Sequence, residues 1–322
     1  MDRRSHIGMA SLIVVIALFA GVTSAIGVMA RGDGSVQTVT NERGVSFEMV
    51  SSGVYAYNAE RVVAEGVGWD IVTLFLVVPA LLMAAVFVAR GSFRGRLFAA
   101  GLLGYLFYQY LEYSVTWAFG PLLLAYVGIF GGSLAALVWV ARDLAQEGVA
   151  GRFDERFPRR GWTAFGIVMA ALLLLLWVRR ITLALGGDLV GGGLTSETTM
   201  TVQALDLGLV VPVLLISAFL VWQRSEAGRV LAAVCAVAFS AMALAILGML
   251  VSAWAVEGVL EAMPVVIFGL AAAAAMGLGL RMFASVVPAD ENADPAAVQL
   301  GDGSGGRTRT YDQAVNSRPL YH

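Results

Sequence analysis

Long apolar segments constrain the fold of this chain more than any other feature of the sequence. Each holds roughly 20 apolar residues, enough for a helix to cross the ~30 Å hydrocarbon core of a bilayer. They lie near 7–30, 68–89, 97–118, 120–141, 162–185, 201–222, 230–254 and 262–284. Of the 322 residues, 59% are apolar and only 14% are charged, which excludes an ordinary soluble domain. The sequence therefore predicts an all-α, polytopic integral membrane protein with about eight transmembrane helices.

The placement of arginine predicts how these helices are oriented. With the N-terminus inside, 13 arginines flank the inner ends of the helices and five flank the outer ends. Basic residues favour the cytoplasmic side, so both termini are expected in the cytoplasm of a multi-pass cell-membrane protein. The first segment contains TSA (23–25), which resembles a signal-peptidase site. Its 24 residues exceed the core of a signal peptide, so we expect the segment to be retained.

A passage of the sequence occurs twice, 133 residues apart. VVPALLMAAVFVARGSFRGRLFAA (77–100) and VVPVLLISAFLVWQRSEAGRVLAA (210–233) are identical at 12 of 24 positions. Apolar matches are common among membrane segments, whereas proline, serine and Gly-Arg matches in one frame are not. The repeat unit would be four helices, so both copies would enter the membrane in the same direction. We therefore predict two parallel four-helix repeats.

The domain boundaries follow from this repeat. The first repeat is expected at 1–141 and includes an outer loop at 31–67. Within that loop a short hairpin is predicted around Asn41 to Gly44. A cytoplasmic loop at 142–161 precedes the second repeat at 162–285. The polar, Gly-rich segment 286–322 is predicted to be a disordered cytoplasmic tail.

Two carboxylates stand at the head of the repeated stretches. Asp70 aligns with Gln203, and Asp206 aligns with Thr73. Each helix thus carries a polar pair at i and i+3, on one face. Carboxylates within a membrane usually face the interior of a bundle or a water-filled cavity. This interpretation is favoured for Asp206, while Asp70 is equally well read as an exposed acid at the outer interface.

A third acid lies on the segment near 97–118. Tyr105, Tyr108, Gln109 and Glu112 have spacings that trace one helical face. They are candidates for binding a solute or an ion. The alternative is a polar network that only fixes the packing of the helices.

Two further features complete the candidate site. Arg179 and Arg180 have apolar sequence on both sides, so each either reaches the headgroups or pairs with one of the acids. Pro79 and Pro212 lack an N–H and are expected to break their helices, freeing the carbonyls of Phe75 and Gly208. We expect the polar residues to line an outward-facing cavity between the two halves.

The composition also argues against several classes of function. Every basic residue is arginine, which excludes a lysine Schiff base. One cysteine and two histidines at the chain ends give no intramembrane metal or haem ligand set, so no metal site and no cofactor are predicted. The net charge of −2 gives no reason to expect nucleic acid. The spans hold no cluster of His, Cys or Ser typical of a catalytic site, so we do not expect an enzyme.

The sequence leaves more than one function open. A transporter of a small solute or of a proton or cation, using the intramembrane carboxylates, is favoured by the paired halves and proline-containing helices. A non-transporting receptor, or a structural subunit of a larger membrane complex, is the alternative. Membrane lipid and a small-molecule or ion ligand are the expected partners. The sequence does not indicate a protein partner or an oligomeric state.

Overall fold

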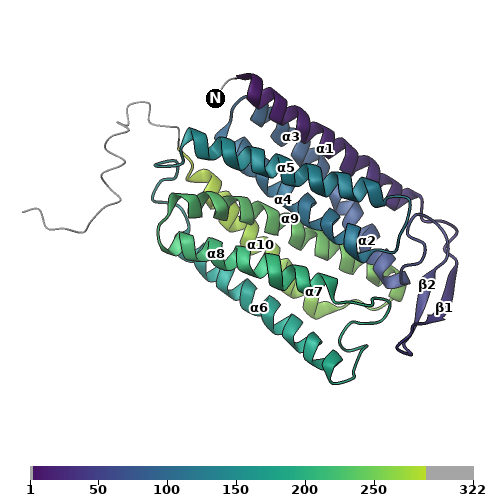
Figure 1. Ribbon diagram of the computed structural model, residues 1–322. Coiled ribbons are helices and arrows are strands. Elements are labelled where there is room, and N and C mark those ends of the chain that lie inside the picture. The colour runs from purple at the N-terminus through teal and green to yellow at the C-terminus, as the bar shows by residue number, and fades with distance from the viewer. Residues whose placement is uncertain (1–2, 288–322) are drawn as a thin grey trace, which may run out of the picture. The chain divides into compact units, whose positions relative to one another are not determined.

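The computed structural model describes residues 3–287 as a helical bundle with one small hairpin (Figure 1). The α-helices are α1 (Arg3–Met29), α2 (Glu60–Val72), α3 (Val78–Ala89), α4 (Phe93–Thr116), α5 (Leu123–Glu147), α6 (Arg159–Leu185), α7 (Thr201–Leu205), α8 (Val211–Trp222), α9 (Glu226–Glu257) and α10 (Ala262–Ala284). Two single π-helical turns, η1 (Thr73–Val77) and η2 (Asp206–Val210), join α2 to α3 and α7 to α8. Most of the expected tail at 286–322 lies outside the described residues.

Seven of these helical rods are long and apolar enough to cross a membrane. They are α1, the rod Glu60–Ala89, α5, α6, the rod Thr201–Trp222, α9 and α10. Large apolar side chains cover their outer surfaces: Phe75, Leu175 and Leu270 are about 70% exposed (71%, 70% and 68%). Such a surface is suited to lipid and not to water. The chain is an α-helical multi-pass membrane protein.

Most helices begin and end within four residues of the predicted bounds, and the largest differences are at the start of α2 and the end of α5. The segments expected at 201–222 and 262–284 match the structure, whereas the one expected at 68–89 begins at Glu60. The cytoplasmic loop expected at 142–161 is shorter, because α5 continues to Glu147 and α6 begins at Arg159. The added parts of α5 and α6 are mostly polar, whereas the added part of α2, ERVVAEGV (60–67), mixes charged and apolar residues. Hydropathy measures the apolar part of a helix, so it misses turns that extend beyond the hydrocarbon region.

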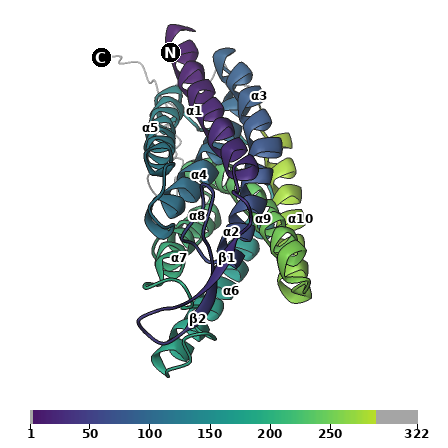
Figure 2. The same cartoon turned by 90° about the vertical axis from the view of Figure 1, so that its right-hand side faces the viewer.

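Helices α4 and α9 lie in the middle of the bundle and pack against each other (Figures 1 and 2). Helix α4 also contacts α3 and α5, while α9 contacts α8 and α10. The outer helices α1 and α6 pack on α3 and α8. In α4, 16 of 24 residues are buried, more than in any of its described neighbours. This explains why α4 tolerates polar side chains, since it meets protein on most of its surface.

Two glycines allow α2 and α9 to cross at close range. A methyl group on Gly68 would lie 2.2 Å from the carbonyl oxygen of Gly248, and one on Gly248 would lie 2.8 Å from the carbonyl oxygen of Gly68. Neither contact can be relieved by a side-chain rotation, because both involve backbone. Small residues at helix crossings are the usual way in which membrane helices approach closely.

Substituting Gly68 by Ala is expected to lower the free energy of unfolding by about 1–3 kcal/mol, because the backbones of α2 and α9 must separate. Gly131 on α5 has open space around it, so Gly131→Ala is the matched control. It is expected to leave the stability unchanged or slightly raised. The midpoint of SDS-induced unfolding, followed by circular dichroism, measures both changes. Equal midpoints for the two variants would contradict the close crossing.

The repeated sequence forms the same turn in both of its copies. Ser92 caps α4 by accepting a hydrogen bond from the N–H of Gly95 at 3.1 Å, and Ser225 caps α9 through Gly228 at 3.4 Å. Gly91 and its counterpart Arg224 both adopt positive φ, at 73° and 63°. Serine is a preferred N-cap, and a left-handed residue commonly ends the preceding helix. The matching Ser and Gly residues therefore have a local structural reason to recur.

Each repeated proline follows a π-helical turn and does not interrupt its rod. The N–H of Val78, just before Pro79, donates to the carbonyl of Thr73, five residues earlier. The N–H of Val211, before Pro212, donates to the carbonyl of Asp206 in the same way. The expected breaks at the prolines are thus continuous helices that widen by one residue. Isolated π-turns of this kind are frequent at functional sites.

The loop between α1 and α2 folds around a short hairpin, as predicted. Strands β1 (Val36–Thr40) and β2 (Ser46–Val50) pair antiparallel, with Val36 opposite Val50 and Thr40 opposite Ser46. The Asn41 side chain accepts hydrogen bonds from the N–H groups of Arg43 and Val45, at 2.9 and 3.0 Å. Asparagine favours such turns because its side chain bonds nearby backbone groups. We call the end of the bundle that carries these strands the hairpin end.

Candidate functional site

Asp206, the first residue of η2, is held by neutral donors from two other helices. The Tyr108 hydroxyl on α4 donates to Oδ1, and the indole N–H of Trp177 on α6 donates to Oδ2 at 2.8 Å. Tyr108 and Trp177 are both buried, and Asp206 is half-buried. Within residues 3–287 the carboxylate therefore has hydrogen-bond partners for both oxygens but no ion-pair partner.

Glu112 lies one turn after Tyr108 on α4 and is only 8% exposed. Its Oε2 atom has no hydrogen-bond partner among residues 3–287. Side chains at i and i+4 share a helical face, so Glu112 and Tyr108 point in similar directions. A buried oxygen without a protein partner requires water, an ion or a proton.

Asp70 on α2 is 1% exposed, so it lies inside the bundle and not at an exposed interface. Tyr55, in the loop after β2, donates its hydroxyl to Asp70 Oδ2, while Oδ1 has no partner in the described residues. Burial, and then the negative charge of Asp70, raise the pKa of Tyr55 well above its ordinary value. The tyrosine thus remains a donor at neutral pH.

Gly27 on α1 makes room for this pair. A methyl group there would lie 2.1 Å from the Tyr55 hydroxyl oxygen and 2.2 Å from Asp70 Oδ2. Only glycine fits, because both polar atoms are fixed by each other. The contact between the loop residue and the helix therefore depends on a third element, α1.

Thr73, the first residue of η1, occupies the position in the first rod that Asp206 has in the second. Its hydroxyl is 2.8 Å from the Tyr105 hydroxyl and 2.9 Å from Gln109 Oε1, both on α4. Gln109 is fully buried, and its Nε2 atom has no partner within residues 3–287. Each π-turn therefore begins with a polar residue that bonds to α4.

The four polar residues of α4 serve two sites and not one. Tyr105 and Gln109 bond to η1, whereas Tyr108 bonds to η2. At 100° per residue these side chains span an arc of about 100°, which is wide enough to reach two neighbours. One polar face of α4 therefore meets two neighbouring elements. Helix α4 forms a common wall between Asp70 and Thr73 on one side and Asp206 on the other.

The remaining candidates lie at the edges of this arrangement. Gln203 is buried on α7. Arg179 is exposed, and the Arg180 guanidinium lies over the Trp177 ring at 5.3 Å. Within residues 3–287 neither arginine forms an ion pair with an acid. Of the two alternatives for these arginines, pairing with the carboxylates is not seen.

Loops cover the hairpin end of the bundle. The Asn41 side chain donates to the carbonyl of Thr195 at 2.6 Å, and Arg43 donates to the carbonyl of Thr198 at 3.1 Å. Burial, together with the negative charge of Glu65, raises the pKa of Glu197 in the same loop. Outside the bundle core, a hydrogen-bonded contact thus joins the hairpin to the 186–200 segment.

Arg61 joins the two parts of the bundle at this end. It contacts Glu65 on its own rod at 3.0 Å, Glu257 at the end of α9 at 3.1 Å, and Glu261 just before α10 at 2.7 Å. Glu257 and Glu261 lie on either side of the short turn between α9 and α10. Their partner is 196 and 200 residues away along the chain, which no local pattern reveals.

The opposite end of the bundle holds a charged network that sequence reasoning missed. Arg96 on α4 is fully buried and pairs with Asp143 on α5 at 2.5 Å, and with Glu147 one turn further on. Arg152 pairs with Glu147 at 3.2 Å, and His6 on α1 approaches Asp143 at 3.6 Å. Polar clusters therefore occur at both ends of the bundle.

The network lies beside contacts that join the loop between α5 and α6 to the end of α10. The N–H of Asp154 donates to the carbonyl of Ser285 at 2.8 Å, and Arg94 donates to the carbonyl of Val286 at 2.6 Å. The boundary expected at 286 is thus slightly early, because Val286 is buried and bridged to Phe153. The spacing of Asp143 and Glu147 at i and i+4, after an apolar run, is the signal that could have revealed this network.

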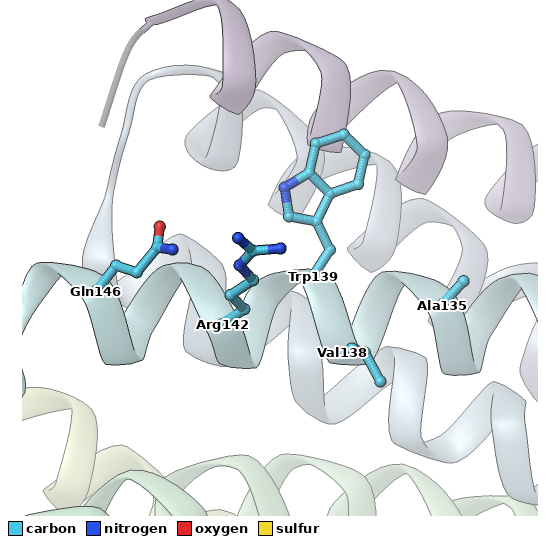
Figure 3. Close-up of a pocket in the computed structure, with 5 residues that line it drawn as sticks. All are labelled: Ala135, Val138, Trp139, Arg142 and Gln146. Atoms are coloured by element: carbon cyan, nitrogen blue, oxygen red, sulfur yellow. The ribbon is translucent and has the colours of Figure 1, made fainter.

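The part of the chain that the structure describes contains a small hollow beside Tyr55 and a larger one on α5. One, beside Tyr55, Tyr113, Trp117 and Tyr126, has a volume of only about 10 Å³, about enough for one water molecule. The other has about 350 Å³ and lies on α5, away from the carboxylates (Figure 3). The aromatic side chains at the hairpin end fill most of the space beneath the outer loop, with Tyr55 and Trp117 ring centroids 4.2 Å apart.

Comparison with known proteins gives no relative. No family model matches the sequence, and neither a curated protein nor a solved structure matches the chain.

Proposed function

We propose that the protein is a transporter of the cell membrane that binds a proton or a small cation at intramembrane carboxylates. The observation that carries the proposal concerns the ion-pair partners of Asp70, Glu112 and Asp206. Within residues 3–287 none of them has a basic partner within 4 Å. A negative charge in the membrane interior is costly, so binding a proton or cation relieves that cost.

Their hydrogen-bond partners support the same interpretation. Asp206 is contacted by two donors that tolerate either protonation state, because a tyrosine hydroxyl can rotate to accept a bond. The unpartnered oxygens of Asp70 and Glu112 leave positions for a proton or a water. Such groups are typical of proton relays in membrane transporters.

The pattern of helix contacts supports two related halves, with α4 as an eighth transmembrane helix. The contacts α1–α3, α3–α4 and α4–α5 have counterparts in α6–α8, α8–α9 and α9–α10. Helices α4 and α9 begin at aligned residues, Phe93 and Glu226. We infer parallel repeats related by a two-fold axis along the membrane normal. The central α4–α9 pair would be the contact about which the halves move.

Orientation is part of the proposal. Arginines cluster at the end of the bundle opposite the hairpin, which by the positive-inside rule is cytoplasmic. Described arginines there include Arg90, Arg94, Arg142, Arg156 and Arg224, all exposed. The carboxylates Asp70, Glu112 and Asp206 would then be reached from outside. With the loops closed as described, the molecule would be in an occluded state.

A flux assay tests this function directly. The purified protein is reconstituted into liposomes containing a pH-sensitive dye, and an inside-negative potential is imposed with K⁺ and valinomycin. We expect acidification of the lumen faster than in protein-free liposomes. If no flux of protons, Na⁺ or K⁺ exceeds that of protein-free liposomes under any imposed gradient, the transport proposal is rejected.

A non-transporting receptor or structural subunit is the second candidate, and the close packing of the hairpin end favours it. Tyr55 covers Asp70, and the space beside it holds no more than one water. In that case the loops would form a fixed outer surface for a partner. A stable stoichiometric partner in a native purification, with no flux in liposomes, would support this function over transport.

A further inference from the structure

The larger hollow is a groove along the last turns of α5. It is lined by Ala135, Val138, Trp139, Arg142 and Gln146, and has a volume of about 350 Å³. In Figure 3 the Trp139, Arg142 and Gln146 side chains project from the same side of α5, toward the neighbouring helix. None of these residues belongs to the carboxylate sites.

The groove changes character along its length. At the end of the groove nearer the middle of α5, Ala135 and Val138 make the lining apolar. Val138 is 61% exposed at the surface of the bundle. Arg142 and Gln146 lie one and two turns further toward the C-terminal end of α5, and they make that end of the groove polar. Eleven residues at 1.5 Å each separate its two ends by about 16 Å. An acyl chain followed by a polar headgroup has this same sequence of properties.

Trp139 lies between the two parts and is supported by α1. A methyl group on Gly8 would come within 3.3 Å of the Trp139 ring, so glycine allows the indole to pack on α1. Tryptophan is enriched at the level of lipid headgroups, where an apolar body and a polar N–H are both satisfied. The residue therefore marks the level of the membrane–water interface on α5.

Positive charge surrounds the polar part of the groove. His6 of α1 approaches Asp143 at 3.6 Å, and a methyl group on Gly91 would come within 3.2 Å of the His6 ring. The start of α1, the turn after α3 and the end of α5 thus meet at this corner. They bring with them the exposed arginines Arg3, Arg4, Arg90 and Arg142.

Among the residues that the structure describes, no acid neutralises this charge. None of the four arginines forms an ion pair within residues 3–287. The nearby acids Asp143 and Glu147 are already paired with Arg96 and Arg152. An anion placed at Arg142 would therefore meet unopposed positive charge.

We propose that this groove binds an anionic phospholipid of the cytoplasmic leaflet, with its phosphate at Arg142 and an acyl chain along Ala135 and Val138. Arginine suits phosphate because its planar guanidinium donates two parallel hydrogen bonds. Basic pockets at the cytoplasmic ends of membrane helices commonly select anionic headgroups. The inference uses the proposed orientation but does not depend on transport.

Native mass spectrometry of the detergent-purified protein tests this site. Phosphatidylglycerol and phosphatidylcholine with identical acyl chains are added in turn to wild type, Arg142→Ala and Arg142→Glu. We expect wild type to retain phosphatidylglycerol preferentially, Arg142→Ala to weaken its affinity about fivefold, and Arg142→Glu to remove the preference. Arg281→Ala, which removes an exposed arginine from α10, is the matched control and should bind like wild type.

Three outcomes would overturn the proposal. The first is equal retention of both lipids by wild type. The second is an equal loss of affinity in Arg142→Ala and Arg281→Ala, which would indicate only a diffuse charge effect. The third is displacement of the lipid by glycerol 3-phosphate at comparable concentration, which would indicate a site for soluble phosphate. Circular dichroism of each variant verifies that the helical fold is retained.

Discussion

The Asp206→Asn variant is expected to lose proton flux, falling to the rate of protein-free liposomes. The amide cannot take up a proton at accessible pH. The variant therefore cannot bind and release the proton that the Asp206 carboxylate is proposed to transfer. The fold should survive the change. Trp177 can still donate to the Asn oxygen, and the Tyr108 hydroxyl can rotate to accept from the new amide.

Two companion variants separate loss of the proton site from loss of packing. Asp206→Glu keeps a titratable carboxyl in a slightly different position and should retain part of the flux. Asp33→Asn changes an exposed acid that bonds Ser35 and Ser52 in the outer loop, and should behave as wild type. All variants are compared at equal protein per liposome. Unchanged flux in Asp206→Asn would remove Asp206 from the transport mechanism.

The sequence predicted the transmembrane segments well, because a helix that crosses the lipid must be apolar over about 20 consecutive residues. Two segments, 201–222 and 262–284, have the predicted bounds. The hairpin was also predicted, since asparagine and glycine at a turn have local conformational reasons. The start of α2 at Glu60 was missed, because polar helical turns outside the hydrocarbon region resemble loop sequence.

The candidate site was predicted in part. An acid in an apolar run is unusual enough to stand out, and Asp70, Glu112 and Asp206 were found in that way. Their partners were not, because Tyr55 and Trp177 approach from elements far away in the sequence. Periodicity gives the face of a helix but not which neighbour it meets. For that reason α4 was assigned one polar face, although it contacts two π-turns.

The charged network opposite the hairpin was missed for a different reason. Arginines and acids at the end of an apolar segment are normally solvated, so composition gave no cause to bury them. Arg96 has a repeat counterpart, Arg229, which is partly exposed and bonds Glu226 and the Phe153 carbonyl. The two arginines occupy the same position in the repeat, within SFRGRLFAA (92–100) and SEAGRVLAA (225–233). Only the acids on α5 make one of them a buried ion-pair residue.

Because Arg96 is buried and Arg229 is partly exposed, replacing each arginine is expected to lower the free energy of unfolding by a different amount. Arg96→Met should lower the free energy of unfolding by about 3–5 kcal/mol, because Asp143 would be left buried without its charge partner. Arg229→Met removes the equivalent arginine and should cost only about 1 kcal/mol, since its partners are closer to solvent. SDS-induced unfolding, followed by circular dichroism, measures both. Equal losses in the two variants would contradict a special role for the buried pair.

The double variant Arg96→Met/Asp143→Leu shows whether the cost comes from the unpaired charge. If it does, removing the acid as well should restore most of the lost stability, because apolar side chains of similar volume can replace a buried pair at little cost. Glu147 would still be paired with Arg152. If the double variant is as unstable as Arg96→Met, the arginine stabilises the bundle by packing and not by charge. The network would then be a consequence of a tight helix crossing and not its cause.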